Sequence, residues 1–204
     1  ILCVIKKTRK GKAEGRLLEV VKKSPLEMDV PACKHFDQCG GCSYQTLPYE
    51  EQVALKGRQI KRLLEPVLPE NSFDDLFEGV IPSPNQFAYR NKMEFSFGDA
   101  YFNGPLSLGM HKRGSFYDIV TVDGCQIIDE DMRCVLMETL AYFQERGANY
   151  YHKMRHEGYL RHLLVRKAAK TGEILVDLVT SSDARFLQKD ATEPATEVQA
   201  DALE

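Results

Sequence analysis

Three of the six cysteines in this 204-residue chain lie close together in a segment with no helix or strand pattern. They are spaced as Cys33-x5-Cys39-Gly40-Gly41-Cys42, and the surrounding residues 30–44 are rich in turn formers. The two glycines would let the backbone turn tightly enough for several thiolates to face one centre. Metal binding would offset the conformational entropy lost when such a coreless loop becomes ordered.

A fourth thiolate is available at Cys125, which follows Gly124 at the end of a predicted strand. Four thiolates suit a [4Fe-4S] cluster. A structural zinc site usually pairs two short Cys-x-x-Cys knuckles, whereas this sequence has one knuckle, one nearby cysteine and one distant cysteine. The spacing therefore favours a cluster, and zinc or unligated cysteines stay open as alternatives. The expected ligands are Cys33, Cys39, Cys42 and Cys125.

The other cysteines and a nearby histidine have weaker claims to such a site. His35 could replace one cysteine, but a loop histidine is more often solvated. Cys134 lies in a predicted amphipathic helix and is most simply a small buried side chain, and Cys3 has no evident partner. Disulfides are disfavoured by the size of the chain and by the lack of a secretory signal.

The elements that would position these residues are two amphipathic helices and several short strands. Residues 49–64 place apolar side chains on one stripe and end before Pro66, which predicts a helix with a docking face. Asp129 is a good N-cap for a second helix, and Gly147 supplies its C-terminal stop. Strands are predicted at residues 2–7, 16–22, 87–98, 106–110, 116–122, 160–167 and 173–180.

The connections between these strands indicate the fold class. The first two strands should be joined by a loop that turns at Gly11 and Gly15, and Asn103-Gly104-Pro105 supplies a further turn. The last two strands carry apolar residues on both faces, as a central strand pair would. The sum is an α+β fold with a mixed, mainly antiparallel sheet and flanking helices.

An ordered series of motifs resembles the RNA uracil-5-methyltransferases, the S-adenosylmethionine-dependent enzymes that make 5-methyluridine in ribosomal or transfer RNA. A lone Cys-Gly-Gly-Cys would be weak evidence, but the series spans roughly residues 1–180. Its members are Cys33-x5-Cys39-Gly-Gly-Cys42, then Ser43-Tyr44-Gln45-x-Leu47-x-Tyr49-x-x-Gln52-x-x-x-Lys56, Tyr89-Arg90-Asn91-Lys92, Gly109-Met110-His111-Lys112, Asp118-Ile119-Val120 with Cys125, and Gly158-Tyr159-Leu160-Arg161-His162-Leu163.

The resemblance implies a domain organisation. In that family an N-terminal TRAM domain, an OB-like RNA-binding barrel, precedes a central domain with a [4Fe-4S] cluster and a C-terminal Rossmann-like catalytic domain. Residues 1–27 would be the C-terminal part of the TRAM-like barrel. Residues 28–182 would be the central domain, with the cluster loop and helix at 28–65. Residues 183–204 are expected to be an acidic tail, in part vector-derived.

The resemblance also implies that the chemistry lies outside this chain, whose start at Ile1 is expected of a fragment. The family uses a cysteine thiolate that adds to C6 of uracil and a carboxylate that removes the C5 proton. Neither Cys3 nor Cys134 lies in a matching motif, and the strand-like residues 174–178 are followed by no glycine-rich turn. We therefore expect no catalysis here, with S-adenosylmethionine bound only by the missing domain. A structural role is expected for the cluster, because this methylation uses no electrons, and redox or iron sensing stays open as the secondary alternative.

Cations that could bind RNA phosphates fall into several groups. Arg90 and Lys92 flank Asn91 on a predicted strand, so alternation should put them on one face. Phe116 and Tyr117 could stack a base, although core packing is expected for at least one of them. The resemblance favours three of the groups, and the candidates taken from them are Arg90, Lys92, His111, Lys112, Arg113, Arg161 and Arg166. These three groups also contain His162 and Lys167, and the group that the resemblance does not favour is the first-loop set Lys6, Lys7, Arg9, Lys10 and Lys12.

Charge and hydropathy limit the class of protein. A net charge of -3 excludes a uniformly basic nucleic-acid wrapper but permits a basic face. The sequence shows neither a membrane-spanning apolar run nor a signal peptide, which predicts a cytoplasmic protein without a membrane partner. The predicted function is the RNA-recognition and cluster-binding part of an RNA uracil-C5 methyltransferase, with ribosomal RNA favoured over transfer RNA and no obligate protein partner. The alternative is a stand-alone zinc or iron–sulfur module that binds no RNA.

Overall fold

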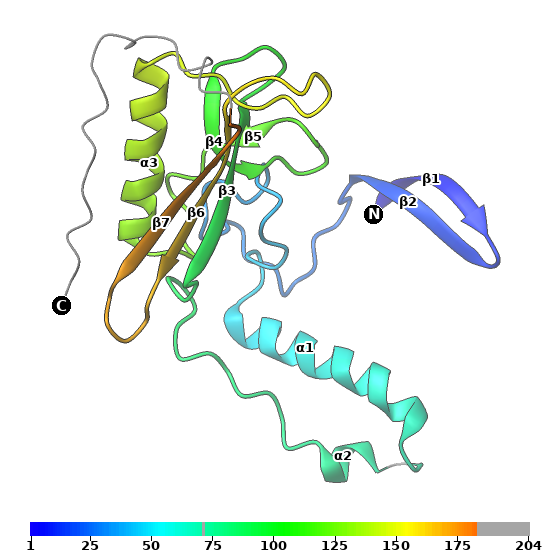
Figure 1. Ribbon diagram of the computed structural model, residues 1–204. Coiled ribbons are helices and arrows are strands. Elements are labelled where there is room, and N and C mark those ends of the chain that lie inside the picture. The colour runs from blue at the N-terminus through cyan, green and yellow to red at the C-terminus, as the bar shows by residue number, and fades with distance from the viewer. Residues whose placement is uncertain (71, 183–204) are drawn as a thin grey trace. The chain divides into compact units, whose positions relative to one another are not determined.

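The computed structural model describes residues 1–70 and 72–182, which form two compact units (Figure 1). Unit one comprises residues 1–32 and 44–83. Unit two comprises residues 33–43 and 84–182. The cysteine-rich loop therefore belongs to unit two, although the chain on both sides of it belongs to unit one. The acidic tail expected at residues 183–204 lies outside the described residues.

Unit one begins with an antiparallel hairpin of β1 (Leu2–Arg9) and β2 (Lys12–Glu19). Its turn is only two residues long, because Lys10 and Gly11 both take positive φ angles, of 49° and 75°, as a tight hairpin turn requires. The predicted longer loop is therefore wrong, and so is the turn at Gly15. Gly15 lies inside β2 opposite Ile5, where the Val4 carbonyl passes close to its backbone.

Unit one continues with α1 (Tyr49–Leu64), whose bounds confirm the predicted helix, and the 3-10 turn η1 (Glu65–Val67). The short helix α2 (Phe73–Leu76) was not predicted, since four residues carry too little periodicity. Part of the apolar stripe of α1 packs near the chain around α2, where Val53, Phe77 and Val80 line one groove. No helix among the described residues has both the length and the apolar character needed to cross a bilayer.

Unit two is built on a five-stranded sheet in the order β5-β4-β3-β6-β7, in which all neighbours are antiparallel. This confirms the mainly antiparallel α+β class. One helix, α3 (Glu130–Glu145), lies alongside the sheet and contacts β4 and β6 (Figure 1). The strands are β3 (Lys92–Asp99), β4 (Leu106–His111), β5 (Ile119–Val120), β6 (Leu160–Lys167) and β7 (Ile174–Thr180).

The core of unit two lies between the sheet and α3. Alternate residues of β3 point inward, and Phe95 is fully buried. The Phe97 ring meets the Phe143 ring of α3 edge to face, with centroids 5.9 Å apart. The other core side chains are mainly aliphatic residues of β4, β6, α3 and the segment before α3: Met93, Leu108, Val122, Cys125, Ile127, Ile128, Met132, Leu136, Leu140, Ala148, Leu160, Leu163 and Val165.

Both predicted ends of α3 are confirmed. The Asp129 carboxylate accepts a hydrogen bond from the Met132 N–H at 3.1 Å, and Gly147 follows the helix with a φ of 61°. Lys167 of β6 donates hydrogen bonds to Asp129 and Asp131, so the start of the helix is tied to the end of the strand. The expectation that Cys134 is buried is wrong, because its side chain is exposed on α3.

The Asp129 carboxylate should make the stability of unit two depend on pH. Burial alone would raise the pKa of Asp129, but the hydrogen bonds from Lys167 and the Met132 N–H outweigh burial and lower it. Asp129→Asn keeps a capping oxygen but removes the charge, and it should cost about 1 kcal/mol at neutral pH. A lowered carboxyl pKa stabilises the fold above the unfolded value of about 4, so this difference should shrink as the pH falls below that value and vanish once the pH is below the lowered pKa of the folded state. Denaturant unfolding of the wild type and of Asp129→Asn at several pH values measures this difference in the free energy of unfolding. A difference that persists in acid would show that the charge of Asp129 is not its cause.

Two predicted strands are shorter in the structure than in the sequence pattern. Residues 87–91 precede β3 without strand pairing, and only residues 119–120 of the predicted 116–122 strand pair with β4. Phe116 and Tyr117 are exposed, so the expected core packing of at least one of them is wrong.

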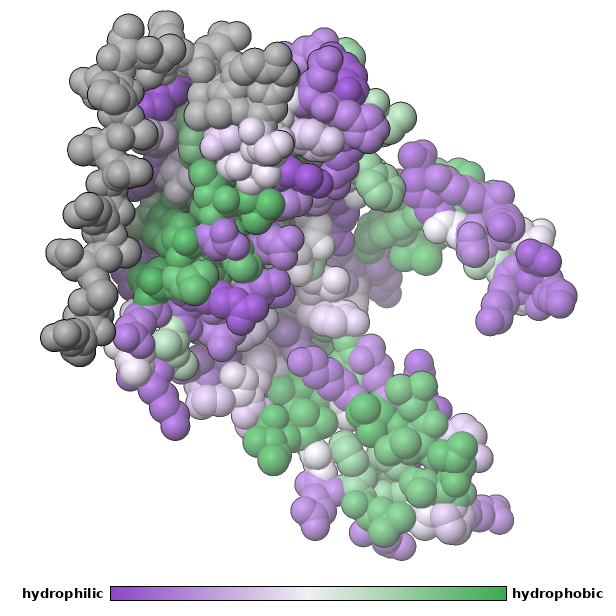
Figure 2. Space-filling model, in the orientation of Figure 1, coloured by the Kyte–Doolittle hydropathy of each residue, from purple (hydrophilic) through white to green (hydrophobic). Residues whose placement is uncertain are grey.

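The last hairpin differs from its predicted central position. β6 is internal, but β7 forms an edge of the sheet and is exposed along most of its length. Figure 2 shows hydrophobic side chains gathered over this part of the surface. The exposed apolar residues of β7 are Ile174, Leu175, Val176, Leu178 and Val179.

Candidate functional site

The four cysteines predicted as ligands line one cavity in unit two. Cys33 and Cys125 are buried, with 6% and 8% of their surfaces exposed, and Cys39 and Cys42 are half-buried. The cavity has an empty volume of about 380 Å3, including the solvent at its mouth. The other lining residues are mainly apolar: His35, Phe36, Gly41, Arg90, Met93, Met110, Val122 and Ile127. The fold thus brings Cys33 and Cys125, which are 92 positions apart in the sequence, to the same cavity.

Backbone hydrogen bonds fasten the cysteine loop to the end of β4. Cys39 pairs with Lys112 in an isolated bridge. The Gly40 N–H donates to the His111 carbonyl at 3.0 Å, and the Arg113 N–H donates to the Gln38 carbonyl at 2.7 Å. A side chain at Gly40 would approach the His111 carbonyl oxygen to 3.1 Å. Gly40 therefore permits close backbone contact; it does not take the positive φ of a tight glycine turn.

The Arg113 side chain also stabilises this loop. Its guanidinium donates to the Cys42 carbonyl at 2.6 Å and to the Phe36 carbonyl at 3.4 Å. It lies 5.4 Å from the centroid of the Phe36 ring, within cation–π range. Arg113 is one of the predicted RNA-binding residues; the contacts that the structure shows for its guanidinium are ones that hold the loop.

A second set of contacts joins the start of the loop to the segment that carries Cys125. Lys34 Nζ lies 2.7 Å from one Asp123 carboxylate oxygen, and His35 Nε2 lies 2.8 Å from the other. The Lys34 hydrogen bond is the main cause of the lowered pKa of Asp123. The His35 side chain is only 13% exposed, so the expectation of a solvated histidine is wrong. Sequence reasoning missed the Lys34–Asp123 pair, because no spacing signal links residues so far apart.

Burial controls the protonation of two of the thiols. It raises the pKa of Cys39 and of Cys125, and the hydrogen bond from the Gly41 N–H to Cys39 Sγ at 3.3 Å acts to lower the pKa of Cys39. Metal binding to these sulfurs would have to displace their protons. Within residues 1–70 and 72–182, no group of three or more His, Cys, Asp or Glu side chains is arranged to hold a metal ion.

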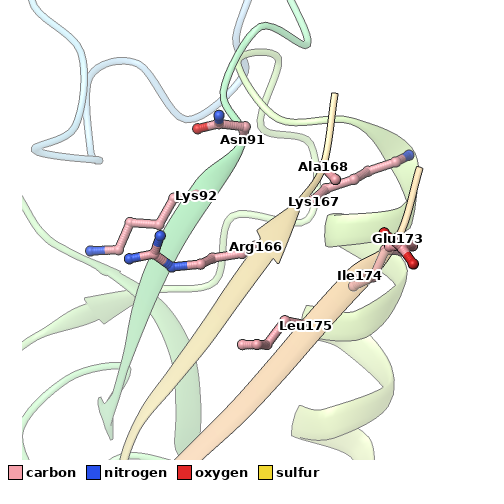
Figure 3. A pocket seen from close by; sticks show the side chains of 8 residues that line it. All are labelled: Asn91, Lys92, Arg166, Lys167, Ala168, Glu173, Ile174 and Leu175. Carbon is pink, nitrogen blue, oxygen red and sulfur yellow. The ribbon is translucent and has the colours of Figure 1, made fainter. Parts of the chain in front are cut away.

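Two of the predicted RNA-facing cations lie side by side on the sheet. Lys92 of β3 is directly opposite Arg166 of β6 in the antiparallel register. Figure 3 shows both side chains extending to the same side of the sheet, below Asn91. Lys92 Nζ lies 3.2 Å from the Glu94 carboxylate. An open pocket is lined by Lys92 and Arg166 together with Asn91, Lys167, Ala168, Glu173, Ile174 and Leu175.

The predicted pairing of Arg90 with Lys92 on one strand face is wrong. Arg90 precedes β3 and lines the cysteine cavity, whereas Lys92 lines the pocket in Figure 3. Two residues near the start of a strand can diverge in this way because alternation applies only where the chain is extended and paired. The cation that lies beside Lys92 is Arg166, from another strand.

The remaining candidates have contacts of their own. Arg161 lies over the Tyr151 ring, with its guanidinium carbon 4.6 Å from the ring centroid. His162 is half-buried, and burial lowers its pKa. Lys112 Nζ is 3.9 Å from the Asp118 carboxylate, and His111 ends β4 beside the cysteine loop. The candidates thus fall into one group around the cysteine loop and another on β3 and β6.

Comparisons with known proteins find relatives among RNA methyltransferases. No family model matches the chain. A curated but uncharacterised RNA methyltransferase of Caldanaerobacter subterraneus is 44% identical over 189 residues, which covers 93% of this chain and 41% of that protein. The tRNA (uracil(54)-C(5))-methyltransferase of Pyrococcus horikoshii is 31% identical over 176 residues, which covers 86% of this chain and 39% of that protein.

A solved structure shares the fold. The crystal structure of the Pyrococcus abyssi tRNA (uracil-54, C5)-methyltransferase in complex with S-adenosyl-L-homocysteine aligns with a TM-score of 0.60 at 24% identity, covering 89% of this chain and 39% of that one. The chain spans about two-fifths of the length of its curated relatives. It is therefore related over nearly its whole length to RNA methyltransferases, and it corresponds to a part of them.

Proposed function

We propose that this chain is the RNA-recognition and [4Fe-4S]-binding part of an S-adenosylmethionine-dependent RNA uracil-C5 methyltransferase. The observation that carries the proposal is the meeting of four cysteines around one cavity, in a chain related to RNA methyltransferases. Methyl transfer and S-adenosylmethionine binding are assigned to the part of the relatives that this chain does not span. Residues 1–70 and 72–182 then serve to bind and orient RNA.

The residues around the cavity fit a [4Fe-4S] cluster in their chemistry. Four sulfur donors match the ligand number of the cluster, and the lining between them is largely apolar and contains Met93, Met110 and Val122. When bound, the cluster would join Cys125 to the three cysteines of the loop. The proposed ligands are Cys33, Cys39, Cys42 and Cys125.

The proposed role of the cluster is structural. The loop of residues 33–43 contains no helix or strand, and its links to the rest of unit two are a bridge, a few hydrogen bonds and the ion pairs of Asp123. The same loop adjoins His111, Lys112 and Arg113. A bound cluster would therefore fix the position of the cations next to it.

The RNA-binding residues of the proposal are those predicted from the sequence: Arg90, Lys92, His111, Lys112, Arg113, Arg161 and Arg166. The proposed preference for ribosomal RNA finds no support, since the named substrate of the Pyrococcus horikoshii relative is tRNA. A TRAM-like barrel is proposed for residues 1–27. Both strands of the β1–β2 hairpin are exposed along their whole length, and an isolated hairpin is at best marginally stable.

RNA binding by the purified chain tests the proposal. We expect it to bind a tRNA transcript or a ribosomal RNA fragment with an affinity that falls as salt rises, and to transfer no methyl group from S-adenosylmethionine by itself. Filter binding to both RNAs, with duplex DNA of equal length as the control, measures this. Equal binding to all three nucleic acids, or binding to none, would contradict an RNA-recognition function.

The Lys92 and Arg166 pair should account for part of the salt dependence. Their positions opposite each other suit two contacts to an RNA backbone, so the double variant Lys92→Ala/Arg166→Ala should reduce the slope of log affinity against log salt by roughly one unit for each lost contact. Lys170→Ala, in the exposed turn between β6 and β7, is the matched control and should leave the slope unchanged. An unchanged slope in the double variant would remove both residues from the interface.

A further inference from the structure

Four aromatic side chains of unit two are exposed to an unusual degree. Phe116 is 89% exposed, Phe102 is 86% exposed, and Tyr101 and Tyr117 are 62% and 71% exposed. Burying a Phe side chain stabilises a fold by about 1.5 to 3 kcal/mol, so rings left in water give up a gain that the core nearby could have provided. Such residues point to an interaction surface.

The loop between β3 and β4 holds Tyr101 and Phe102 in a closed turn. The Gly104 N–H donates to the Tyr101 carbonyl at 2.6 Å, and the Ala100 N–H donates to the Pro105 carbonyl at 3.2 Å. Asn103 takes a positive φ of 56°, as the tight turn requires. The rings are therefore presented by a short hydrogen-bonded loop.

The loop between β4 and β5 holds Phe116 and Tyr117 in the same manner. The Ser115 hydroxyl accepts hydrogen bonds from the Tyr117 N–H at 3.3 Å and the Asp118 N–H at 3.2 Å. The Ser115 N–H donates to the Lys112 carbonyl at 3.0 Å. This loop too is ordered by its own polar groups, which leaves its rings without a structural role in the turn.

An isolated bridge brings the two loops together. Asp99, at the end of β3, pairs with Asp118, just before β5. Tyr101 and Phe116 are each two residues from this bridge, so chain geometry alone keeps their Cα atoms within roughly 20 Å of each other. The two aromatic pairs therefore belong to one region of unit two.

The charges near this region indicate the partner. Lys112 is exposed at the base of the second loop, with only a 3.9 Å contact to Asp118. The Tyr150 hydroxyl donates to Asp99 at 3.0 Å, which ties in a further loop that carries the exposed cations Lys153 and Arg155. Exposed rings next to cations are the combination that binds single-stranded RNA, since the bases stack on the rings and the cations attract the phosphates.

We infer that Phe102 and Phe116, with Tyr101 and Tyr117, form a stacking platform for unpaired bases of the RNA. This inference rests on the proposed function and adds to it a second kind of recognition. The platform selects unpaired nucleotides by stacking on the faces of their bases, whereas Lys92 and Arg166 bind the phosphates of the RNA backbone.

Substitutions that remove a ring but keep an apolar side chain test the platform. Phe102→Leu and Phe116→Leu should each weaken binding of the full chain to a single-stranded RNA of about 12 nucleotides by roughly 5- to 150-fold. The loss should be similar at low and high salt, because stacking involves no counterion release. Tyr142→Leu, at a half-exposed ring of α3, is the matched control and should bind as the wild type does. Far-UV circular dichroism of each variant checks that the fold is retained.

A direct readout is available because the chain contains no tryptophan. Phe116→Trp should retain RNA affinity, and its indole fluorescence should be quenched when the single-stranded RNA binds. Tyr142→Trp places the same reporter on α3 and should show no quenching. A fully paired RNA duplex should quench neither variant, since its bases are already stacked.

The outcomes separate this inference from the proposed function. If the wild type binds RNA while both leucine variants bind equally well and the Phe116→Trp signal is unchanged, the platform is refuted and RNA recognition stands. If the wild type binds no RNA, the platform and the proposed function both fall.

Discussion

Cys125→Ala should abolish iron and sulfide binding and leave the rest of unit two folded. Cys125 alone among the four proposed ligands lies outside the loop of residues 33–43, so without it the other three cannot be joined to the core side of the cavity. Alanine suits the buried position, because Cys125 also packs in the core. The anaerobically purified wild type should contain about four irons and four sulfides per chain, and the variant close to none.

The chain offers a matched control for this experiment. Cys134→Ala removes an exposed cysteine of α3 that does not line the cavity, and it should retain the full iron and sulfide content. Thermal unfolding of the metal-free wild type and of the two metal-free variants measures how much each substitution by itself lowers the stability of the fold. Stoichiometric zinc without sulfide in the wild type would contradict the cluster and favour the alternative of a zinc module.

Gly109→Ala should destabilise unit two by about 3 kcal/mol or more, which is the upper range for overpacking. A Cβ atom at Gly109 would lie 2.0 Å from the carbonyl oxygen of Val120, where β5 pairs with β4. The clash is with backbone, so rotation of a side chain cannot relieve it. In a unit of this size the midpoint of thermal unfolding should fall by roughly 13 °C or more.

Gly57→Ala is the contrasting control for Gly109→Ala. Gly57 lies in the middle of α1, and the nearest atoms to an added Cβ are side-chain carbons at 3.7 Å. Alanine favours a helix over glycine by about 1 kcal/mol, so this variant should be as stable as the wild type or more stable. Equal melting temperatures for the wild type and Gly109→Ala would show that β5 can move away from β4 at little cost.

The helices were the most predictable part of the fold. The bounds of α1 and the cap of α3 follow from local signals: an apolar stripe that ends before proline, and an aspartate in position to accept the Met132 N–H. Strand limits were less predictable because they depend on partners. Phe116 lies in a segment with strong strand propensity, yet the loop there closes through Ser115 and leaves the ring in water.

The candidate site was predictable to the extent that it has a chemical signature. The cysteine spacing predicted that Cys33, Cys39, Cys42 and Cys125 share one site, and the structure places all four around one cavity. The contacts that support this site leave no such signature. The Asp123 carboxylate, which joins Lys34 and His35 to the Cys125 segment, looks in the sequence like any surface acid.

The open edge at β7 has a consequence for the behaviour of this chain in solution. Its outer backbone groups face no neighbouring strand among the described residues, and its exposed side chains are mostly apolar. Natural sheets usually protect such an edge with lysine, proline or a bulge, whereas the charge within β7 is limited to Asp177. A strand of a second molecule could extend the sheet here, so concentrated preparations should tend to associate edge to edge unless another polypeptide segment covers β7 first.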